Sequence, residues 1–203
     1  MRQIFQVILL ATIFGIGCFS YQTIGADIVW DEAVNGDLSD DPSTPTPITF
    51  STGANTIIGS LFPEPGDDLR DYITFTINPG QFLTGIFLDT FSPAEGLSFH
   101  GINAGSTSFI PDFGTADQFL GLDFLGIDML GTDLMPNLAA GQYDSQGFTI
   151  PLGPGTYSYV IQEITPGETR DYQLTFQVVP EPSSAIFFCV AGLVFTLRRG
   201  RRK

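Results

Sequence analysis

Between its two apolar ends this chain has no lysine and no cysteine. Both cysteines, Cys18 and Cys189, lie in the terminal apolar stretches, so residues 27–181 offer no disulfide, thiolate nucleophile or cysteine-ligated zinc site. That segment holds two arginines, Arg70 and Arg170, against all 22 acidic residues, a formal charge of −20. Because lysine and arginine bind nucleic acid and anionic lipid, we expect no nucleic-acid partner.

Catalytic motifs are equally scarce. His100 is the single histidine, and the sequence has no Gly-x-Ser-x-Gly elbow, His-Glu-x-x-His pair or phosphate-binding glycine loop. Paired carboxylates can hydrolyse glycosides, but among 22 acids some lie together by chance. We therefore expect a protein that is not an enzyme. A hydrolase is a less favoured alternative, and it would need a pocket that contains His100 with two acids.

The N-terminus has the features of a secretory signal peptide. Arg2 precedes an apolar run from Ile4 to Phe19, and Ala26 is a small residue suited to cleavage before Asp27. A cut nearer Ser20 is an alternative. A lipoprotein signal ending at Cys18 is disfavoured because the residue three positions ahead is not leucine. The sequence predicts an exported protein with a signal helix in residues 1–26.

The C-terminus combines three features in a fixed order. Pro180-Glu181-Pro182 comes first, an apolar run over 185–197 follows, and the basic residues Arg198, Arg199, Arg201, Arg202 and Lys203 end the chain. As a helix the run would span about 20 Å, against a hydrocarbon core of about 30 Å. The basic end stays in the cytoplasm, and the prolines favour extended backbone before the helix.

This order resembles the PEP-CTERM sorting tag of bacterial exported proteins, over residues 180–203. The resemblance implies an exosortase-type membrane peptidase as partner, transient residence in the inner membrane, and delivery to the cell envelope or the extracellular matrix with its polysaccharide. The alternative is an ordinary C-terminal membrane anchor in which the triplet is incidental.

Residues 27–179 predict one all-β domain, an antiparallel β-sandwich of jelly-roll type. Alternation of apolar and polar residues is clearest over 71–77 and 170–179, and 81–89 is apolar on both faces, as in a central strand. Further strands are expected at 27–34, 48–50, 55–61, 97–101, 147–150 and 156–164. Many short strands between Gly/Pro turns are typical of this architecture.

Residues 111–146 are less regular and hold a five-residue repetition. Leucine-glycine pairs begin at Leu120, Leu125 and Leu130, with aspartates at the same step. A β-solenoid has such a period, but so few copies cannot build one. We expect a long loop or short helix whose leucines enter the core.

The domain also resembles the small β-sandwich of bacterial pre-peptidase C-terminal domains. The resemblance rests on Gly66–Tyr72, an Asp-rich loop that leads into an aromatic strand, and on Gly153-Pro-Gly-Thr-Tyr157 near the end of the domain. It implies a small β-sandwich.

Two kinds of binding site remain open as alternatives. Clustered carboxylates bind calcium, and the candidate sets are Asp67, Asp68 and Asp71, or Asp37, Asp40 and Asp41. Acids that only keep loops solvated are the more ordinary interpretation, so we expect no cofactor apart from this candidate calcium.

Exposed aromatics could stack on sugar rings, with Trp30, Tyr157 and Tyr159 as candidates, although alternating aromatics more often belong to a core.

Overall fold

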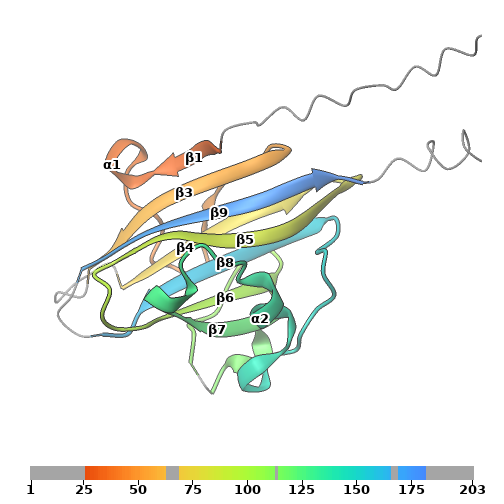
Figure 1. The fold of residues 1–203 in the computed structure, drawn as a ribbon. Coiled ribbons are helices and arrows are strands. Elements are labelled where there is room, and N and C mark those ends of the chain that lie inside the picture. The colour runs from red at the N-terminus through yellow and green to blue at the C-terminus, as the bar shows by residue number, and fades with distance from the viewer. Residues whose placement is uncertain (1–25, 63–68, 113, 166–168, 182–203) are drawn as a thin grey trace, which may run out of the picture.

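The computed structural model describes residues 26–62, 69–112, 114–165 and 169–181, and these form two face-to-face β-sheets with a few short helices (Figure 1). One sheet has the order β1-β3-β9-β5. Its strands are β1 (Asp27–Asp31), β3 (Gly53–Leu61), β9 (Arg170–Pro180) and β5 (Gln81–Ser92). The prediction of an all-β sandwich is confirmed at this level.

The facing sheet has the order β2-β4-β8-β6-β7. Its strands are β2 (Thr46–Pro47), β4 (Arg70–Ile77), β8 (Gly155–Glu163), β6 (Ser98–Ala104) and β7 (Gly121–Leu125). From β3 to β6, consecutive strands alternate between the two sheets, and β8 and β9 then return to central positions, one in each sheet. The short helices are α1 (Glu32–Asn35), α2 (Met135–Ala139) and the 3-10 turns η1 (Ala116–Gln118), η2 (Ile127–Met129) and η3 (Gln142–Asp144).

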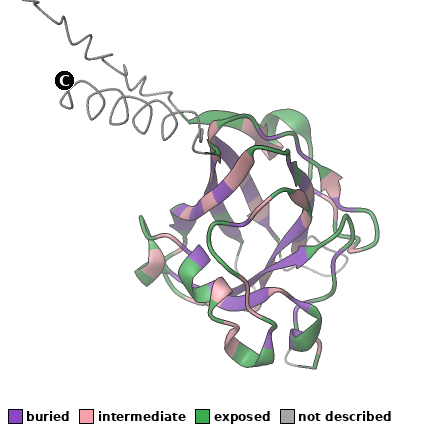
Figure 2. Ribbon diagram, turned by 90° about the vertical axis from the view of Figure 1, so that its right-hand side faces the viewer, coloured by how far each residue is buried: buried purple, intermediate pink, exposed green. Residues whose placement is uncertain are grey.

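Alternation correctly predicts which residues face the core in β4 and β9. Ile73, Phe75 and Ile77 of β4 are buried against the facing sheet, as are Leu174 and Phe176 of β9. A strand places successive side chains on opposite faces, so one apolar face is enough to fix its orientation. Figure 2 shows the buried positions concentrated on the strands and the exposed positions on the connections.

The sandwich is not wholly antiparallel, which corrects the prediction. β1 pairs with β3 in parallel, and β2 pairs with β4 in parallel, while the other strand pairs are antiparallel. Parallel neighbours need a long connection. The chain supplies it, because residues 32–52 separate β1 from β3 and residues 48–69 separate β2 from β4.

β5 was expected to be a central strand but lies at the edge of its sheet. Its outer backbone is nevertheless covered. The Gly131 and Leu134 amides donate to the carbonyls of Leu88 and Ile86, and Leu83 exchanges two hydrogen bonds with Leu152. This covering segment protects the open edge.

β5 looks apolar on both faces because two β-bulges, between Leu83 and Gly85 and between Leu88 and Thr90, shift its alternation. The core residues Leu83, Ile86, Leu88 and Phe91 therefore fall at both odd and even positions.

Three other strand predictions were wrong in detail. The first strand stops at Asp31, because the Asp31 carboxylate accepts the Ala33 amide and caps α1. Ile48 and Phe50 are buried, but residues 48–50 are not a strand. Residues 147–150 are not a strand either, whereas β7 forms inside the stretch that was expected to be irregular.

The leucine-glycine repetition has no structural repeat behind it. Leu125 ends β7 and is fully buried, whereas Leu130 is 39% exposed. Leu134, Met135 and Leu138, around α2, are buried in the main core. The expectation that leucines of this stretch enter the core is confirmed, but the stretch is not only a loop or short helix, because residues 121–125 form β7.

The two ionised side chains of Arg170 and Glu163 lie fully buried at one end of the sandwich. The Arg170 Nε lies 2.8 Å from Glu163 Oε2, and both side chains are 0% exposed. The same carboxylate oxygen accepts the Ser98 hydroxyl, Arg170 Nη1 donates to the Pro93 carbonyl, and the guanidinium lies over the Phe91 ring. The pair therefore links β5, β6, β8 and β9.

Replacing Arg170 with methionine should destabilise the fold by about 3–5 kcal/mol, because Glu163 is left as an uncompensated buried charge. Adding Glu163→Gln to this variant should recover part of the loss. Arg70→Met is the matched control, since Arg70 is partly exposed and bonds the neutral Gln162, and it should cost less than about 1 kcal/mol. Urea unfolding of residues 27–181 measures all three. Equal losses for Arg70→Met and Arg170→Met would contradict this account of the pair.

Candidate functional site

The candidate sorting triplet begins inside the last strand of the domain. Pro180 is the final residue of β9 and pairs with Gln81 of β5, and the Glu181 amide donates to the Gly80 carbonyl in the β4–β5 turn. Both residues are exposed. Pro182, the apolar run over 185–197 and the basic end lie outside the described residues, so the structure places only the first two residues of the triplet.

β9 changes its surroundings just before the triplet. Up to Val178 the strand is paired on both sides, with β3 at Gly53 and with β5 at Leu83. Val179 and Pro180 pair with β5 alone. Among the described residues, Pro180 is therefore the first exposed position of β9 that pairs with one neighbouring strand only, and extended peptides are commonly bound along such an edge.

Ala26 is the first described residue of the chain, and it is exposed immediately before β1. The preceding residues, which include the predicted apolar signal helix, are outside the described part. Within the described ranges no helix combines the length and the apolar character needed to cross a membrane.

Three carboxylates from different segments meet at the end of the sandwich opposite the triplet. Ligand oxygens of Glu32, Asp37 and Asp71 all lie within 4.8 Å of one another. Asp71 is on the core-facing side of β4, Glu32 is in α1, and Asp37 is in the exposed turn that follows. The cluster takes one residue from each of the two predicted calcium sets.

The cluster is tied to both sheets by hydrogen bonds. Tyr172 of β9 donates its hydroxyl to Asp71 across 2.6 Å. Glu32 accepts the Leu38 amide on one oxygen, and the amide and hydroxyl of Ser60 on the other. Gly59 makes room for this arrangement, since a Cβ there would lie 2.4 Å from the Tyr172 hydroxyl.

The electrostatics of the cluster favour a bound proton or cation on Glu32. Burial raises the pKa of the Glu32 carboxyl, and the neighbouring charge of Asp37 raises it further, against the hydrogen bonds from Leu38 and Ser60 that lower it. Each of the three residues brings one carboxylate oxygen to the cluster, and calcium takes six to eight oxygen ligands. The cluster is a candidate for one part of a cation site.

The remaining residues of the predicted calcium sets lie elsewhere. Asp67 and Asp68 fall outside the described residues. Asp41 is exposed and organises its own turn, because it accepts the amide and hydroxyl of Ser43 and the hydroxyl of Thr44, which lowers the pKa of its carboxyl. Asp40 is exposed and is not in the cluster.

Glu32 was missed because the sequence was interpreted as a strand through Val34. A signal for the correct structure was present: Asp31 is a good helix N-cap, and Gly36 stands where a short helix ends. Nothing local in the sequence shows that Ser60 and Asp71 lie beside this turn.

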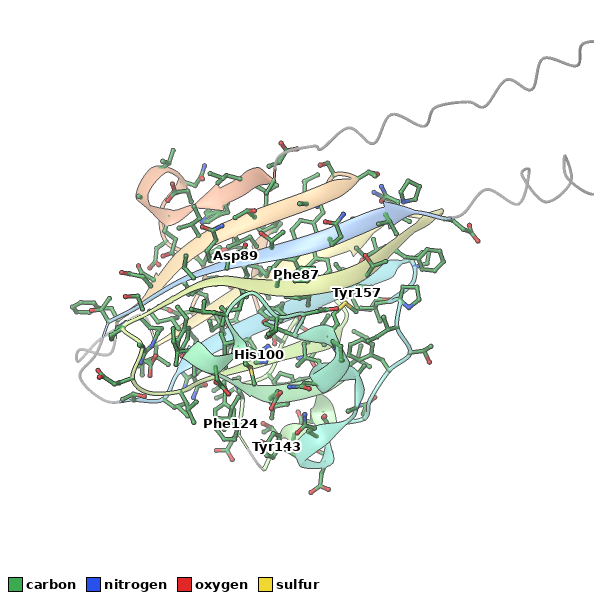
Figure 3. The ribbon with its side chains drawn as sticks, viewed as in Figure 1. Phe87, Asp89, His100, Phe124, Tyr143 and Tyr157 are labelled. Atoms are coloured by element: carbon green, nitrogen blue, oxygen red, sulfur yellow. The ribbon has the colours of Figure 1, made fainter. Side chains whose placement is uncertain are left out.

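His100 lies inside the sandwich, not in an exposed pocket (Figure 3). It is 0% exposed, and its Nδ1 is 2.8 Å from the Tyr159 hydroxyl. Asp123 of β7 is its cross-strand neighbour. Burial lowers the pKa of His100 to about 3 and raises the pKa of the Asp123 carboxyl, whose hydrogen bonds from the Phe124 amide and the Asn137 side chain oppose that rise. His100 is thus a neutral core residue at pH 7, out of reach of a substrate.

The three candidate sugar-stacking aromatics do not form an exposed row. Tyr159 is 2% exposed and packs edge-on against Phe176. Tyr157 contacts Phe75 and bonds the Gly153 carbonyl, and Trp30 of β1, in the other sheet, bonds the Gly36 carbonyl. Both tyrosines belong to the core-facing side of β8.

Comparisons with known proteins identify no family. No protein-family model matches the chain, and no curated protein matches it. Among solved structures the chain is similar to the pre-peptidase C-terminal domain of a collagenase from Bacillus anthracis. The identity is 14%, the match covers 69% of this chain and 99% of that chain, and the TM-score is 0.36. This is the same kind of domain that the sequence motifs Gly66–Tyr72 and Gly153–Tyr157 resemble. A likeness this weak says nothing about function.

Burial of neutral His100 should make the protein less stable in acid. Below a pH of about 6.5 the unfolded chain binds a proton on this histidine that the folded chain does not, so the free energy of unfolding falls as the pH drops toward 3. The contribution is about 3 kcal/mol between pH 7 and pH 4. The raised pKa values of Glu32 and Asp123 act in the opposite direction.

A His100→Gln variant isolates the histidine, because glutamine keeps a polar side chain and does not titrate. Its stability at pH 7 is expected to be lower than that of the wild type, but its decline from pH 7 to pH 4 should be shallower by about 3 kcal/mol. Urea unfolding across this range measures both slopes. Parallel slopes in the two chains would mean that His100 does not remain neutral in the folded state.

Proposed function

We propose that this protein is exported, is held in the membrane by its C-terminal tail, and is recognised at Pro180-Glu181-Pro182 by an exosortase-type membrane peptidase. The observation that carries the proposal is the order of triplet, apolar run and basic end in the sequence. The exposure of Pro180 and Glu181 at the end of β9 supports it, since a peptidase needs an extended, accessible segment. Release would deliver the domain to the envelope or the extracellular matrix.

The register of β9 limits where the tail can be cut without unfolding the domain. Residues up to Val178 are held between β3 and β5, and Glu181 is still bonded to the β4–β5 turn. Cleavage within the strand would remove part of a central element of the sheet. We infer that the processed product ends at or after Glu181 and keeps the complete sandwich.

The domain itself has a non-enzymatic surface or matrix role in this proposal. Its single histidine is buried. Arg170 is neutralised internally by Glu163, which leaves Arg70 as the one other basic residue of the described chain, facing a large excess of carboxylates. A strongly anionic surface keeps an exported domain soluble and repels anionic polymers. Neutral polysaccharide is the matrix partner that such a surface tolerates.

A calcium-dependent carbohydrate-binding module is the second candidate, and one observation favours it. Glu32, Asp37 and Asp71 gather three carboxylates although they come from separate segments. A module that binds sugars by stacking them on exposed aromatic rings gains no such support, because Tyr157 and Tyr159 point into the core. The hydrolase alternative needs an accessible His100, and that histidine is fully buried.

We further infer a jelly-roll topology. From β3 to β6, consecutive strands alternate between the sheets, and β8 and β9 return between strands that are already in place, β4 and β6 in one sheet and β3 and β5 in the other. This arrangement favours the double Greek key of jelly rolls. The covering segment at 131–134 occupies the edge where a further strand would pair with β5.

Replacing Pro180-Glu181-Pro182 with three alanines should leave export intact and block processing, so that the protein accumulates in the inner membrane with its tail. The chain offers a matched control, because a second Pro-Glu-Pro occurs at 63–65 with no apolar run behind it. Alanines at 63–65 should leave processing unchanged. Membrane fractionation of the native host, followed by immunoblotting, measures the unprocessed fraction. Normal processing of the 180–182 variant would show that the triplet is incidental.

A further inference from the structure

Both ends of the described chain lie at the same end of the sandwich (Figure 1). β1 starts at Asp27 beside Asn55 of β3, and the neighbouring Gly53 pairs with Val178 near the end of β9. The predicted signal segment and the predicted tail therefore attach to one end of the domain. We call this end, with the turns that close it, the tether end.

Four turns close the tether end, as the strand pairing shows. Gly53 pairs with Val178, the Glu181 amide bonds the Gly80 carbonyl, Ile77 pairs with Gly155, and the Gly105 amide bonds the Thr156 carbonyl. The turns are residues 51–53, 78–80, 105–107 and 153–155. They are exposed or partly exposed, and they contain no charged side chain.

The opposite end, which we call the far end, carries charge. The carboxylate cluster of Glu32, Asp37 and Asp71 lies there, and so do Asp171, which pairs with Ser92, and the exposed Glu95. β9 runs between the two ends over eleven residues, about 35 Å at roughly 3.3 Å per residue. The tether end carries the exposed acids Asp27 and Glu181 where the two terminal segments attach, but the four turns that project between them are uncharged. In a domain with a formal charge of −20, this makes the turns distinct from the far end.

Chain length places the tether end close to any membrane that holds the tail. Glu181 is bonded to the domain, and the apolar run begins at Ala185, four residues later. Four residues span at most about 14 Å even when fully extended. The headgroup layer adds roughly 5–8 Å outside the hydrocarbon core. No arrangement of so short a connection can lift the domain far from the lipid surface.

We propose that the tether end is a membrane-facing surface that rests on the lipid headgroups while the tail is inserted, with the carboxylates of the far end directed away from the membrane. The proposal rests on the proposed function, because it requires the apolar run to be in the bilayer. Bacterial membranes expose anionic lipids, and their field decays over about a Debye length, roughly 8 Å. Uncharged turns can lie within that distance without repulsion, whereas the carboxylates of the far end could not.

Site-specific fluorescence quenching tests this orientation in the full chain. With Cys18→Ser and Cys189→Ser the chain has no cysteine, so a single label can be placed at Ser106→Cys or Asn78→Cys on the tether end. Ser92→Cys is the matched far-end control, since Ser92 is also exposed. The chain is reconstituted in vesicles of phosphatidylethanolamine and phosphatidylglycerol that contain a lipid with a nitroxide on its headgroup.

Labels at residues 78 and 106 should lose most of their fluorescence, and the label at 92 should lose almost none. Equal quenching at all three positions, or none at 78 and 106 in chains that float with the vesicles, would overturn the proposal and leave membrane insertion of the tail intact. Chains that do not float with vesicles would overturn tail insertion as well. Protection of residues 78 and 106 by a co-purified peptidase, without quenching by lipid, would mean that the end docks on protein, which also overturns the proposal.

A second comparison tests the charge argument. Adding Thr52→Asp and Ser106→Asp should reduce quenching at residue 78 severalfold in anionic vesicles, and salt or neutral phosphatidylcholine vesicles should restore it. The far-end substitution Ser92→Asp should change nothing. If the two tether-end aspartates leave quenching unchanged, the absence of charge in the turns is not what permits the contact, and the electrostatic explanation of the orientation is wrong.

Discussion

The pairing of β9 with both β3 and β5 is the constraint on which the structure depends. β9 is the last strand of the described chain, yet it occupies an interior position in its sheet. Its first residue, Arg170, belongs to the buried ion pair, and its last residue, Pro180, opens the candidate sorting triplet. The sheet is incomplete until β9 is in place. Because its partners are far away in sequence, it contributes non-local contacts of the kind that form slowly.

Because Pro180 is both the last residue of β9 and the first residue of the candidate triplet, the proposed tag is joined directly to the folded domain. A flexible linker would let a peptidase bind the triplet without regard to the fold. Here the Glu181 amide is bonded to the β4–β5 turn, so the folded sandwich fixes the direction in which the chain leaves. The same register brings the start of β1 to that end. In the function we propose, the export signal at one terminus and the membrane tail at the other would both attach to this end of the domain.

Charge is distributed in keeping with that arrangement. Arg170 is buried against Glu163, so this cation does not offset the acidic surface. At the far end, burial and, to a smaller extent, the neighbouring charge of Asp37 raise the pKa of Glu32, while the turns at the tether end carry no charge. In the arrangement we propose, the domain would remain strongly acidic away from the lipid, because electrostatic repulsion decays over a short distance in salt.

Sequence patterns predicted those features that depend on local periodicity. Alternation in β4 and β9 correctly identified the core-facing residues, since a strand with one buried face must repeat every two residues. Edges and clusters could not be predicted in this way. β5 looks central because two β-bulges shift its alternation, and no local pattern shows that residues 131–134 cover its open edge. Glu32, Asp37 and Asp71 meet only through tertiary folding. The buried contact of His100 with Tyr159 is equally non-local.

The intact mass of the protein, recovered from separate cell fractions of its native host, tests the central claim most directly. The account predicts a species in the envelope or extracellular fraction that starts near Asp27, ends at or shortly after Glu181, and lacks the basic end. A species that runs through Lys203 and stays in the inner membrane would contradict it, because the tail would then be a permanent anchor and the triplet no more than the end of a strand.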